Sequence, residues 1–400
     1  MQKNGECDNN TLQPEATSSP SLSTSPTIFS SPGMIKHKNK AKLMIKCFKW
    51  RHSFKKPKYE EFFDYESKDF NLYEFNTFSS QGTLKDNFTH IKFEPEEINE
   101  INDSEKFNQE REFLKENITF SINDENNFII HTNKHCYISA KYLPSTSELL
   151  QIKKGTEIKI GKYTLNILMV KKNNEITIET NKYSSMQNQE EKICKICLRN
   201  NTDLPFISVC NCKGTLQYAH GYCLFTWIKN KCKIYFEYVN PAYYSLTLCN
   251  FYCEICKSPF PFGVYTDKEH KDFFYLVDGL EKFQNFIILD LKYHDKVTQQ
   301  NKERCEYILL NLSNYYKNEI TIGRGKNCIF HLNNISVSRE HCVISYEKDN
   351  NIIKIVDNKS KFGTLIQNID SCTDFILSNS NPNITIQKGN TVYNFSYCLV

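Results

Sequence analysis

The sequence of 400 residues lacks two features that would place it in or across a membrane. No run approaches the about 18 to 20 consecutive apolar residues of a membrane-spanning helix, and no apolar segment follows the first residues as in a secretory signal. We therefore expect an intracellular protein of the cytoplasm or nucleus, without a transmembrane segment. The length is enough for two to four domains.

Acidic residues are absent from 36–58, where ten of the residues are Lys or Arg. The net charge of +4 therefore hides a local basic segment in a chain that is otherwise negative. Written as a helix, this segment places Leu43, Cys47, Trp50 and Phe54 on one side and lysines on the other. Such a helix is typical of contact with a membrane surface or with calmodulin. A solvated basic segment or a nuclear-import signal fits the composition equally well.

Large apolar residues are nearly absent from 8–33, which is rich in Ser, Thr and Pro. Such a segment cannot bury enough surface to offset the entropy lost on ordering. We assign 1–59 to a disordered tail followed by the basic segment.

Short β-like runs fill two regions, which we expect at 60–185 and 268–400. The predicted fold class is therefore mainly β and multidomain. One pattern occurs in both regions: "LQIKKGTEIKIGKYTLNI" and "ITIQKGNTVYNFSYCLV" each read as strand, Lys-Gly turn and strand.

Cysteines are concentrated between the two β regions, because nine of the seventeen lie from Cys194 to Cys256. An intracellular compartment keeps thiols reduced, so clustered cysteines indicate a metal site more than disulfides. The gaps between successive ligand candidates are two, twelve, one, seven, two, twenty-nine and two residues. The candidates are Cys194, Cys197, Cys210, Cys212, His220, Cys223, Cys253 and Cys256. Four pairs supply eight ligands, which predicts two closed structural zinc sites.

This spacing, with His220 as the fifth ligand and Trp227 four residues after Cys223, resembles a RING-CH zinc finger of MARCH-type ubiquitin ligases. We place the finger at 190–262. The resemblance implies a cross-brace, in which the first and third pairs hold one zinc ion and the second and fourth pairs hold the other. With four protein ligands each, both ions would stabilise the fold and leave no open position for chemistry.

The same resemblance implies a docking surface for a ubiquitin-conjugating enzyme. Ile196 in "CKIC" and Trp227 in "CLFTW" stand where the family makes its apolar contact, and Lys257 stands where many ligases place a basic residue toward ubiquitin. Packing of Trp227 on its own helix is the alternative. No catalytic residue is expected, because such ligases supply no nucleophile.

Two features leave another zinc finger open. The twenty-nine residues before Cys253 are more than a RING-CH finger usually has, and Cys232 and Cys249 are spare thiols. A PHD finger, which reads histone tails, also has histidine as its fifth ligand and often an aromatic residue where Phe251 stands. Two features argue against a PHD finger: the seven-residue gap before His220 is long for that family, and Trp227 has no role in it.

The second β region resembles a forkhead-associated (FHA) domain, a sandwich that binds phosphothreonine peptides. The motifs are "GR" at 323–324, "SREH" at 338–341 and "SKFGT" at 360–364. The resemblance implies that Arg324, Ser338, Arg339 and Lys361 bind the phosphopeptide. It assigns a scaffold role to four further residues, Gly323, His341, Gly363 and Thr364.

One residue departs from the FHA pattern. Phe362 stands where the family usually has an Asn that holds the peptide backbone. The amino-terminal β region ends like an FHA domain but has no Gly-Arg or Ser-x-x-His motif, so we interpret it as a degenerate, FHA-like module.

Together these features predict a RING-type ubiquitin ligase. The zinc finger would recruit a ubiquitin-conjugating enzyme, and the FHA domain would bind phosphothreonine-containing partners. The alternative is a non-catalytic phosphopeptide-binding adaptor or a PHD-like histone reader.

Overall fold

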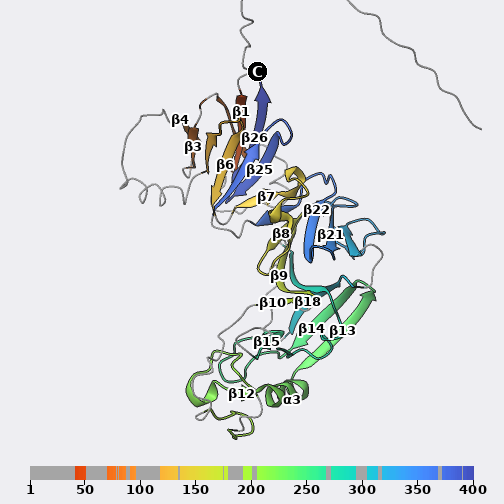
Figure 1. Cartoon of the computed structure of the whole chain (residues 1–400). Helices are drawn as coiled ribbons and strands as arrows, with labels where there is room; N and C mark the ends of the chain where they lie inside the picture. Colours follow the sequence, from red (N-terminus) through yellow and green to blue (C-terminus); the bar gives the residue numbers. More distant parts are fainter. Residues whose placement is uncertain are drawn as a thin grey trace, which may run out of the picture. The chain divides into compact units, whose positions relative to one another are not determined.

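The computed structural model of the chain consists mainly of β-strands, which confirms the predicted fold class (Figure 1). It describes residues 41–50, 70–77, 79, 81–86, 91–95, 118–133, 136–173, 175–178, 192–200, 205–266, 272–293, 304–313, 318–367, 372–389 and 391–400. The Ser/Pro-rich tail and the two ends of the basic segment lie outside these residues. Among the described residues, no helix is long and apolar enough to cross a membrane.

The largest sheet in the described part of the chain has thirteen strands, and twelve of them follow one path of neighbours. Across the sheet, the order is β13 (Lys233–Asn240), β14 (Tyr243–Cys249), β18 (Arg304–Asn311), β17 (Phe286–Tyr293), β9 (Tyr163–Lys172), β8 (Glu157–Ile160), β23 (Leu365–Gln367), β7 (Tyr137–Ser139), β25 (Asn383–Lys388), β26 (Thr391–Leu399), β1 (Ala41–Trp50) and β2 (Phe70–Thr77). The remaining strand, β10 (Glu175–Ile178), pairs with β9.

The basic segment forms strand β1, so the prediction of an amphipathic helix is wrong where the structure describes it. Alternate side chains of a strand point to opposite faces, and Leu43, Ile45 and Cys47 are fully buried on one of them. The strand pairs with β2 on one side and β26 on the other. These apolar side chains are committed to the protein core, and nothing supports the predicted contact with a membrane surface or calmodulin.

Two β-sandwiches share the large sheet. In the N sandwich, β1, β2, β7, β25 and β26 enclose one core with a five-stranded sheet. The order of that sheet is β24 (Cys372–Leu377), β6 (Phe128–Asn133), β5 (Ile118–Ile122), β3 (Gln81–Asp86) and β4 (Ile91–Pro95). In the C sandwich, β8, β9, β17, β18 and β23 enclose a second core with a four-stranded sheet. Its order is β20 (Phe330–His331), β19 (Glu319–Gly323), β21 (Cys342–Glu347) and β22 (Ile352–Asp357).

Each sandwich is completed by a hairpin from the other half of the chain. The β8–β9 hairpin precedes the cysteine cluster in sequence, yet it lies between β17 and β23 of the C sandwich. The β25–β26 hairpin ends the chain, yet it lies between β7 and β1 of the N sandwich. Figure 1 shows β26 beside β1, from opposite ends of the described chain.

The exchange is reciprocal. The order β2-β1-β26-β25-β7 on one side of the large sheet matches β18-β17-β9-β8-β23 on the other, and β7 pairs with β23 where the two meet. There, Ile138 lies opposite Ile366. The exchanged hairpins lie in the two segments whose sequence patterns echo each other, although the Lys-Gly turn of the first segment, at 154–155, precedes β8 and the hairpin itself turns at 161–162. Strand pairing therefore crosses the limits at 185 and 268 that composition suggests.

The zinc-finger region packs on the outer face of the C sandwich's sheet. Along β17, Ile287 and Leu289 belong to the sandwich core, whereas Phe286 and Ile288 belong to the core of the cysteine-rich region. Both faces of β17 are thus covered, which explains its unbroken apolar run. The same region contains 3-10 helix η4 (Gly214–Leu216), helix α3 (Gly221–Lys231) and the short strands β11 (Phe206–Ile207), β12 (Ala219–His220), β15 (Gly263–Tyr265) and β16 (Phe273–Tyr275). Two further 3-10 helices follow β7, namely η1 (Ala140–Tyr142) and η2 (Glu148–Leu150).

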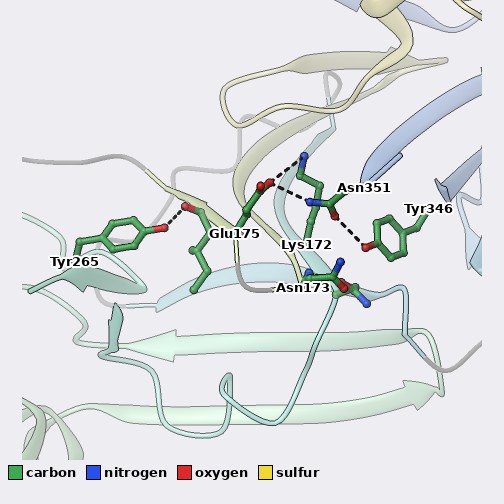
Figure 2. A network of polar contacts seen from close by, with 8 residues as sticks. Lys172, Asn173, Glu175, Tyr265, Tyr346 and Asn351 are labelled. Carbon is green, nitrogen blue, oxygen red and sulfur yellow. Dashed lines mark hydrogen bonds and ion pairs between the residues drawn. The ribbon is translucent and has the colours of Figure 1, made fainter. Parts of the chain in front are cut away.

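A polar network at β10 joins this region to the C sandwich (Figure 2). Tyr265 of β15 donates a hydrogen bond of 2.6 Å to the Ile176 carbonyl. The neighbouring Glu175 carboxylate accepts a 3.1 Å hydrogen bond from the side chain of Asn351, in the β21–β22 turn. Asn351 also accepts a hydrogen bond of 3.0 Å from the Tyr346 hydroxyl. The zinc-finger region and the C sandwich are thus linked by packing and by hydrogen bonds.

Candidate metal centres and phosphate-binding loops

The eight predicted zinc ligands gather into two groups of four. One group contains Cys194, Cys197, His220 and Cys223, and the other contains Cys210, Cys212, Cys253 and Cys256. In each group, the ligand atoms all lie within 4.8 Å of one another. The first group joins the first and third ligand pairs, and the second joins the second and fourth, which is the cross-brace that the RING-CH resemblance implies.

Two turns of the same geometry carry the two Cys-x2-Cys pairs. In the first, the Leu198 N–H donates to the Cys194 carbonyl at 2.8 Å, and Leu198 has a φ of 59°. In the second, the Lys257 N–H donates to the Cys253 carbonyl at 2.8 Å, and Lys257 has a φ of 56°. Each turn brings its two thiols to one side, as a shared metal ion requires.

The distances between ligand atoms fit a tetrahedral zinc ion. Zinc bonds of ordinary length predict about 3.8 Å between two sulfurs and about 3.6 Å between sulfur and nitrogen. The Cys212 and Cys253 sulfurs are 3.7 Å apart. The His220 Nδ1 lies 3.4 Å from the Cys197 sulfur and 3.6 Å from the Cys223 sulfur. The residues present therefore fit two zinc ions, with Nδ1 as the imidazole ligand.

Hydrogen-bond donors surround the cysteine sulfurs. The His220 backbone N–H points to the Cys194 sulfur at 3.4 Å, and the Lys195 ammonium lies 3.3 Å from the Cys210 sulfur. Burial, the largest effect, would lower the pKa of Lys195, but the hydrogen bond to Cys210 and the charges of the nearby cysteines together outweigh it and raise that pKa. A charged lysine suits the second site, because four thiolates exceed the charge of one zinc ion.

The spare thiols take no part in either group. The Cys232 thiol donates to the Asn250 carbonyl at 3.1 Å, and burial raises its pKa to about 11. Cys249 lies in β14, which pairs with β13 and β18. The long gap before Cys253 therefore holds the rest of helix α3 and then the β13–β14 hairpin, which extends the large sheet, and the set of eight ligands is unaffected.

A shallow groove lies between the two cysteine turns. Its cavity has a volume of about 130 Å³, and Ile196 and Trp227 both line it, as do Leu224, Ile255 and Phe260. The Trp227 ring meets the Phe260 ring edge-on, with centroids 6.1 Å apart. The last three residues were not predicted, although the second turn, "CEIC", repeats the isoleucine of "CKIC".

Two groove residues, Ile255 and Trp227, differ in how far they are buried. Ile255 is 58% exposed, whereas Trp227 is partly buried against the cysteine-rich core. The predicted ubiquitin contact, Lys257, does not line the groove, and its ammonium lies 5.5 Å from the Tyr252 ring centroid.

The loops of the C sandwich that carry the FHA motifs are joined by their backbones. The Arg324 N–H donates to the Ser338 carbonyl at 3.0 Å, and the Gly325 N–H donates to the Arg339 carbonyl at 2.9 Å. A side chain on Gly323 would place its Cβ 2.2 Å from that same Arg339 oxygen. Glycine is therefore required at 323 for the two loops to approach so closely.

His341 is fully buried and ties three segments together. Its Nδ1 accepts a hydrogen bond of 3.0 Å from the Ser338 N–H, and its Nε2 donates to the Gly363 carbonyl at 3.1 Å. These partners require a neutral ring with its proton on Nε2. Desolvation by burial lowers the pKa of His341, which keeps the ring in that form.

Asp357 fixes the third loop and was not predicted. Its carboxylate accepts hydrogen bonds from the Ser360 hydroxyl at 2.6 Å and the Thr364 hydroxyl at 2.8 Å. The Ser360 oxygen in turn accepts from the Gly363 N–H at 2.8 Å, where Gly363 has a φ of +80°. An Asp at the end of β22, three residues before Ser360, was the available sequence signal.

Four groups remain for a ligand at the tip of these loops. The side chains of Arg324, Arg339 and Lys361 are exposed, and within the described residues no carboxylate pairs with them. The Ser338 oxygen accepts a hydrogen bond of 3.0 Å from the Lys361 N–H, which leaves the hydroxyl proton free to donate. Three cations and a hydroxyl donor are suited to a phosphate group.

Comparison with known families identifies both regions. Residues 194–256 match the RING-variant domain, and residues 320–386 match the FHA domain. A 49-residue stretch is 49% identical to the probable E3 ubiquitin-protein ligase IE1 of Bovine herpesvirus 4 (strain DN-599). That match covers 11% of this chain and 17% of the viral protein. No solved structure matches. The chain thus contains a RING-variant domain followed by an FHA domain, which favours the RING-type finger over the PHD finger.

Proposed function

We propose that this protein is a RING-type ubiquitin ligase that uses its FHA domain to bind phosphothreonine-containing partners. The groove between the two cysteine turns is the observation that carries the proposal. It places Ile196, Ile255 and Trp227 around one mainly apolar depression, whose lining also includes Lys195 and Glu254. Exposed apolar groups around a depression are the usual anchors of a protein partner, and the partner proposed here is a ubiquitin-conjugating enzyme charged with ubiquitin.

The protein would act by positioning. Zinc, when bound, holds the two turns that form the groove and supplies no open coordination position. Each cysteine sulfur of the eight ligands lies within one group of four. With zinc bound, all of these sulfurs would be metal ligands, so none would be free to act as a nucleophile. Transfer would therefore follow from holding the charged conjugating enzyme beside an acceptor amine.

The FHA loops would choose the acceptor protein. The Arg324 guanidinium and the Ser338 hydroxyl offer donors for phosphate oxygens, and buried His341 and Asp357 hold the loops that carry them. Because the finger packs on β17, and β15, which follows the finger, hydrogen-bonds to β10, we infer that the two binding sites move together.

Autoubiquitination by the full chain with a panel of conjugating enzymes tests the proposal. The full chain is needed because β14 of the finger pairs with β18 of the C sandwich. We expect Ile255→Ala to lower the rate at least about fivefold while zinc content is unchanged, since this side chain is mostly exposed. Tyr222→Ala is the matched control, an exposed aromatic residue of α3 outside the groove.

Two outcomes would count against a ligase. A full chain that gives no ubiquitin product with any conjugating enzyme would refute the proposal. So would product formation that Ile255→Ala and Trp227→Ala leave unchanged. Phosphopeptide binding without ubiquitin transfer would identify an adaptor.

A further inference from the structure

A second cavity lies next to the phosphate-binding loops, where the two sandwiches meet. It has a volume of about 100 Å³, well above the roughly 10–15 Å³ that one water needs. Ser139, Lys141 and Tyr142 line it from the end of β7 and η1, and Lys361 and Phe362 line it from the third FHA loop. The hairpin β25–β26 contributes the remaining polar wall through Thr385 and Asn394. We call this cavity the Lys141 pocket.

The charge of the Lys141 pocket is positive. Two lysines line it and no carboxylate does. The Lys361 ammonium lies 4.9 Å from the centroid of the Phe362 ring, and the Lys141 ammonium lies 5.8 Å from that of Tyr142. Among the described residues, neither lysine has an ion pair. Aromatic faces can hold both cations in place without neutralising them.

Hydrogen-bond donors complete the pocket. Ser139 is only 3% exposed, and its hydroxyl has no polar partner in the described part of the chain. Buried hydroxyls are normally hydrogen-bonded, so an unpaired one that lines a cavity points to a ligand. The Asn394 side-chain oxygen accepts from the Thr385 hydroxyl at 2.8 Å, which leaves the Asn394 amide protons available.

Lys361 connects the pocket to the phosphate site. Its backbone N–H donates to the Ser338 oxygen, and its side chain lines the pocket. A ligand in the pocket would therefore lie near a phosphate held by Arg324 and Ser338. The phenylalanine at 362 replaces the usual amide with a ring that supports the lysine, so the departure from the FHA pattern changes what the loop can bind.

We propose that the Lys141 pocket binds a second anionic side chain of the same phosphopeptide, either a carboxylate or a second phosphate. The inference rests on the proposed phosphothreonine binding and names the class of peptide selected. Lysine ammonium groups and the hydroxyl and amide donors would share the anion. The peptide would thus be read at two points, one of them built partly from the N-terminal half of the chain.

Titration of the full chain with phosphothreonine peptides tests the inference. The reference peptide has neutral residues on both sides of the phosphothreonine, and two further sets carry one Glu or one phosphoserine at each flanking position in turn. We expect one position at which an anionic residue tightens binding about tenfold, equivalent to about 1.4 kcal/mol. The two sets identify whether a carboxylate or a phosphate is preferred.

Variants of Lys141 then test whether the tighter binding of the acidic peptide arises in the Lys141 pocket. With Lys141→Ala, the best acidic peptide should bind no better than the reference peptide, whereas the matched control Lys348→Ala, an exposed lysine outside the pocket, should keep the preference. Lys141→Glu should instead favour a peptide with Lys at that position, which shows that the variant is folded.

The inference is overturned if no anionic position tightens binding, or if the gain survives in both Lys141 variants. In those cases the reference peptide still binds and still depends on Arg324, so the proposed function stands. If no phosphothreonine peptide binds, or if Arg324→Ala has no effect on binding, the proposed function fails and the inference fails with it.

Discussion

The exchange of hairpins between the two sandwiches predicts that a mutation in one half of the chain destabilises the sandwich formed mainly by the other half. Phe395 lies near the carboxyl end of the chain, yet it is fully buried in the core of the N sandwich. Leu165 lies before the zinc finger, yet it is fully buried in the core of the C sandwich. Phe395→Ala should therefore loosen strands near the beginning of the described chain, and Leu165→Ala should loosen the C sandwich.

The magnitude follows from the cavities that these changes leave. Replacing a buried Phe by Ala costs about 3–5 kcal/mol, and replacing a buried Leu by Ala costs about 2–5 kcal/mol. Phe395 lies opposite Ile45 of β1 and Ile384 of β25, so its loss removes contacts with two neighbouring strands. Amides that exchange through opening of the affected sandwich should exchange at least about 30-fold faster in Leu165→Ala and at least about 150-fold faster in Phe395→Ala.

Native-state hydrogen exchange read by mass spectrometry would measure this. We expect Phe395→Ala to accelerate exchange in β1 and β6 more than in β19 and β21, and Leu165→Ala to show the reverse. Each variant serves as the control for the other. If Phe395→Ala instead accelerated hydrogen exchange selectively in β19 and β21, each sandwich would contain the hairpin of its own half of the chain. That result would contradict the swapped hairpins.

Three further predictions concern the two sites. Burial lowers the pKa of His341 below its ordinary 6.5, so the contribution of the neutral ring to stability should be complete above pH 6.5. Below pH 6.5 this contribution should fall by up to about 1.4 kcal/mol per pH unit. Urea denaturation of the wild type and of His341→Gln at several pH values measures the two pH slopes. Equal pH slopes would contradict a neutral ring. Asp357→Ala leaves the donors of Ser360 and Thr364 unpaired, so unfolding free energy should fall by about 1–3 kcal/mol, unlike in Asp349→Ala, a change at an exposed turn. Elemental analysis should find two zinc ions per chain, and chelation should abolish hydrogen-exchange protection in 205–260; retained protection would argue against structural zinc.

The zinc ligands could be predicted from the sequence because their chemistry restricts them. Few residue types bind zinc, and a turn that holds two thiolates fixes the spacing of a pair. The FHA loops were predictable for a similar reason, since Gly323 permits an approach that no other residue allows. The role of Asp357 could not be predicted, because an Asp at a strand end is common and its hydrogen-bond partners are defined only in the folded loop.

The partners of the hairpins could not be predicted from the sequence. Residues 150–167 and 384–400 both read as strands separated by Lys and Gly turns, and this pattern does not say which sandwich each segment completes. Only long-range packing distinguishes them. The basic strand β1 shows a related ambiguity, because Leu43 and Cys47 fit both a helical and a strand period, and only pairing with β26 decides. The length of the gap before Cys253 was visible, but the pairing of β14 with β18 was not.

Transfer of ubiquitin to a phosphorylated acceptor tests the central claim most directly. The full chain, a matching conjugating enzyme and ubiquitin would be supplied with one substrate in two forms, bearing its best phosphothreonine peptide or the same peptide unphosphorylated. We predict at least about tenfold faster transfer to the phosphorylated form, a preference lost in Arg324→Ala and kept in Lys348→Ala. Equal transfer to both forms, or a preference that survives in Arg324→Ala, would contradict a ligase directed by phosphothreonine.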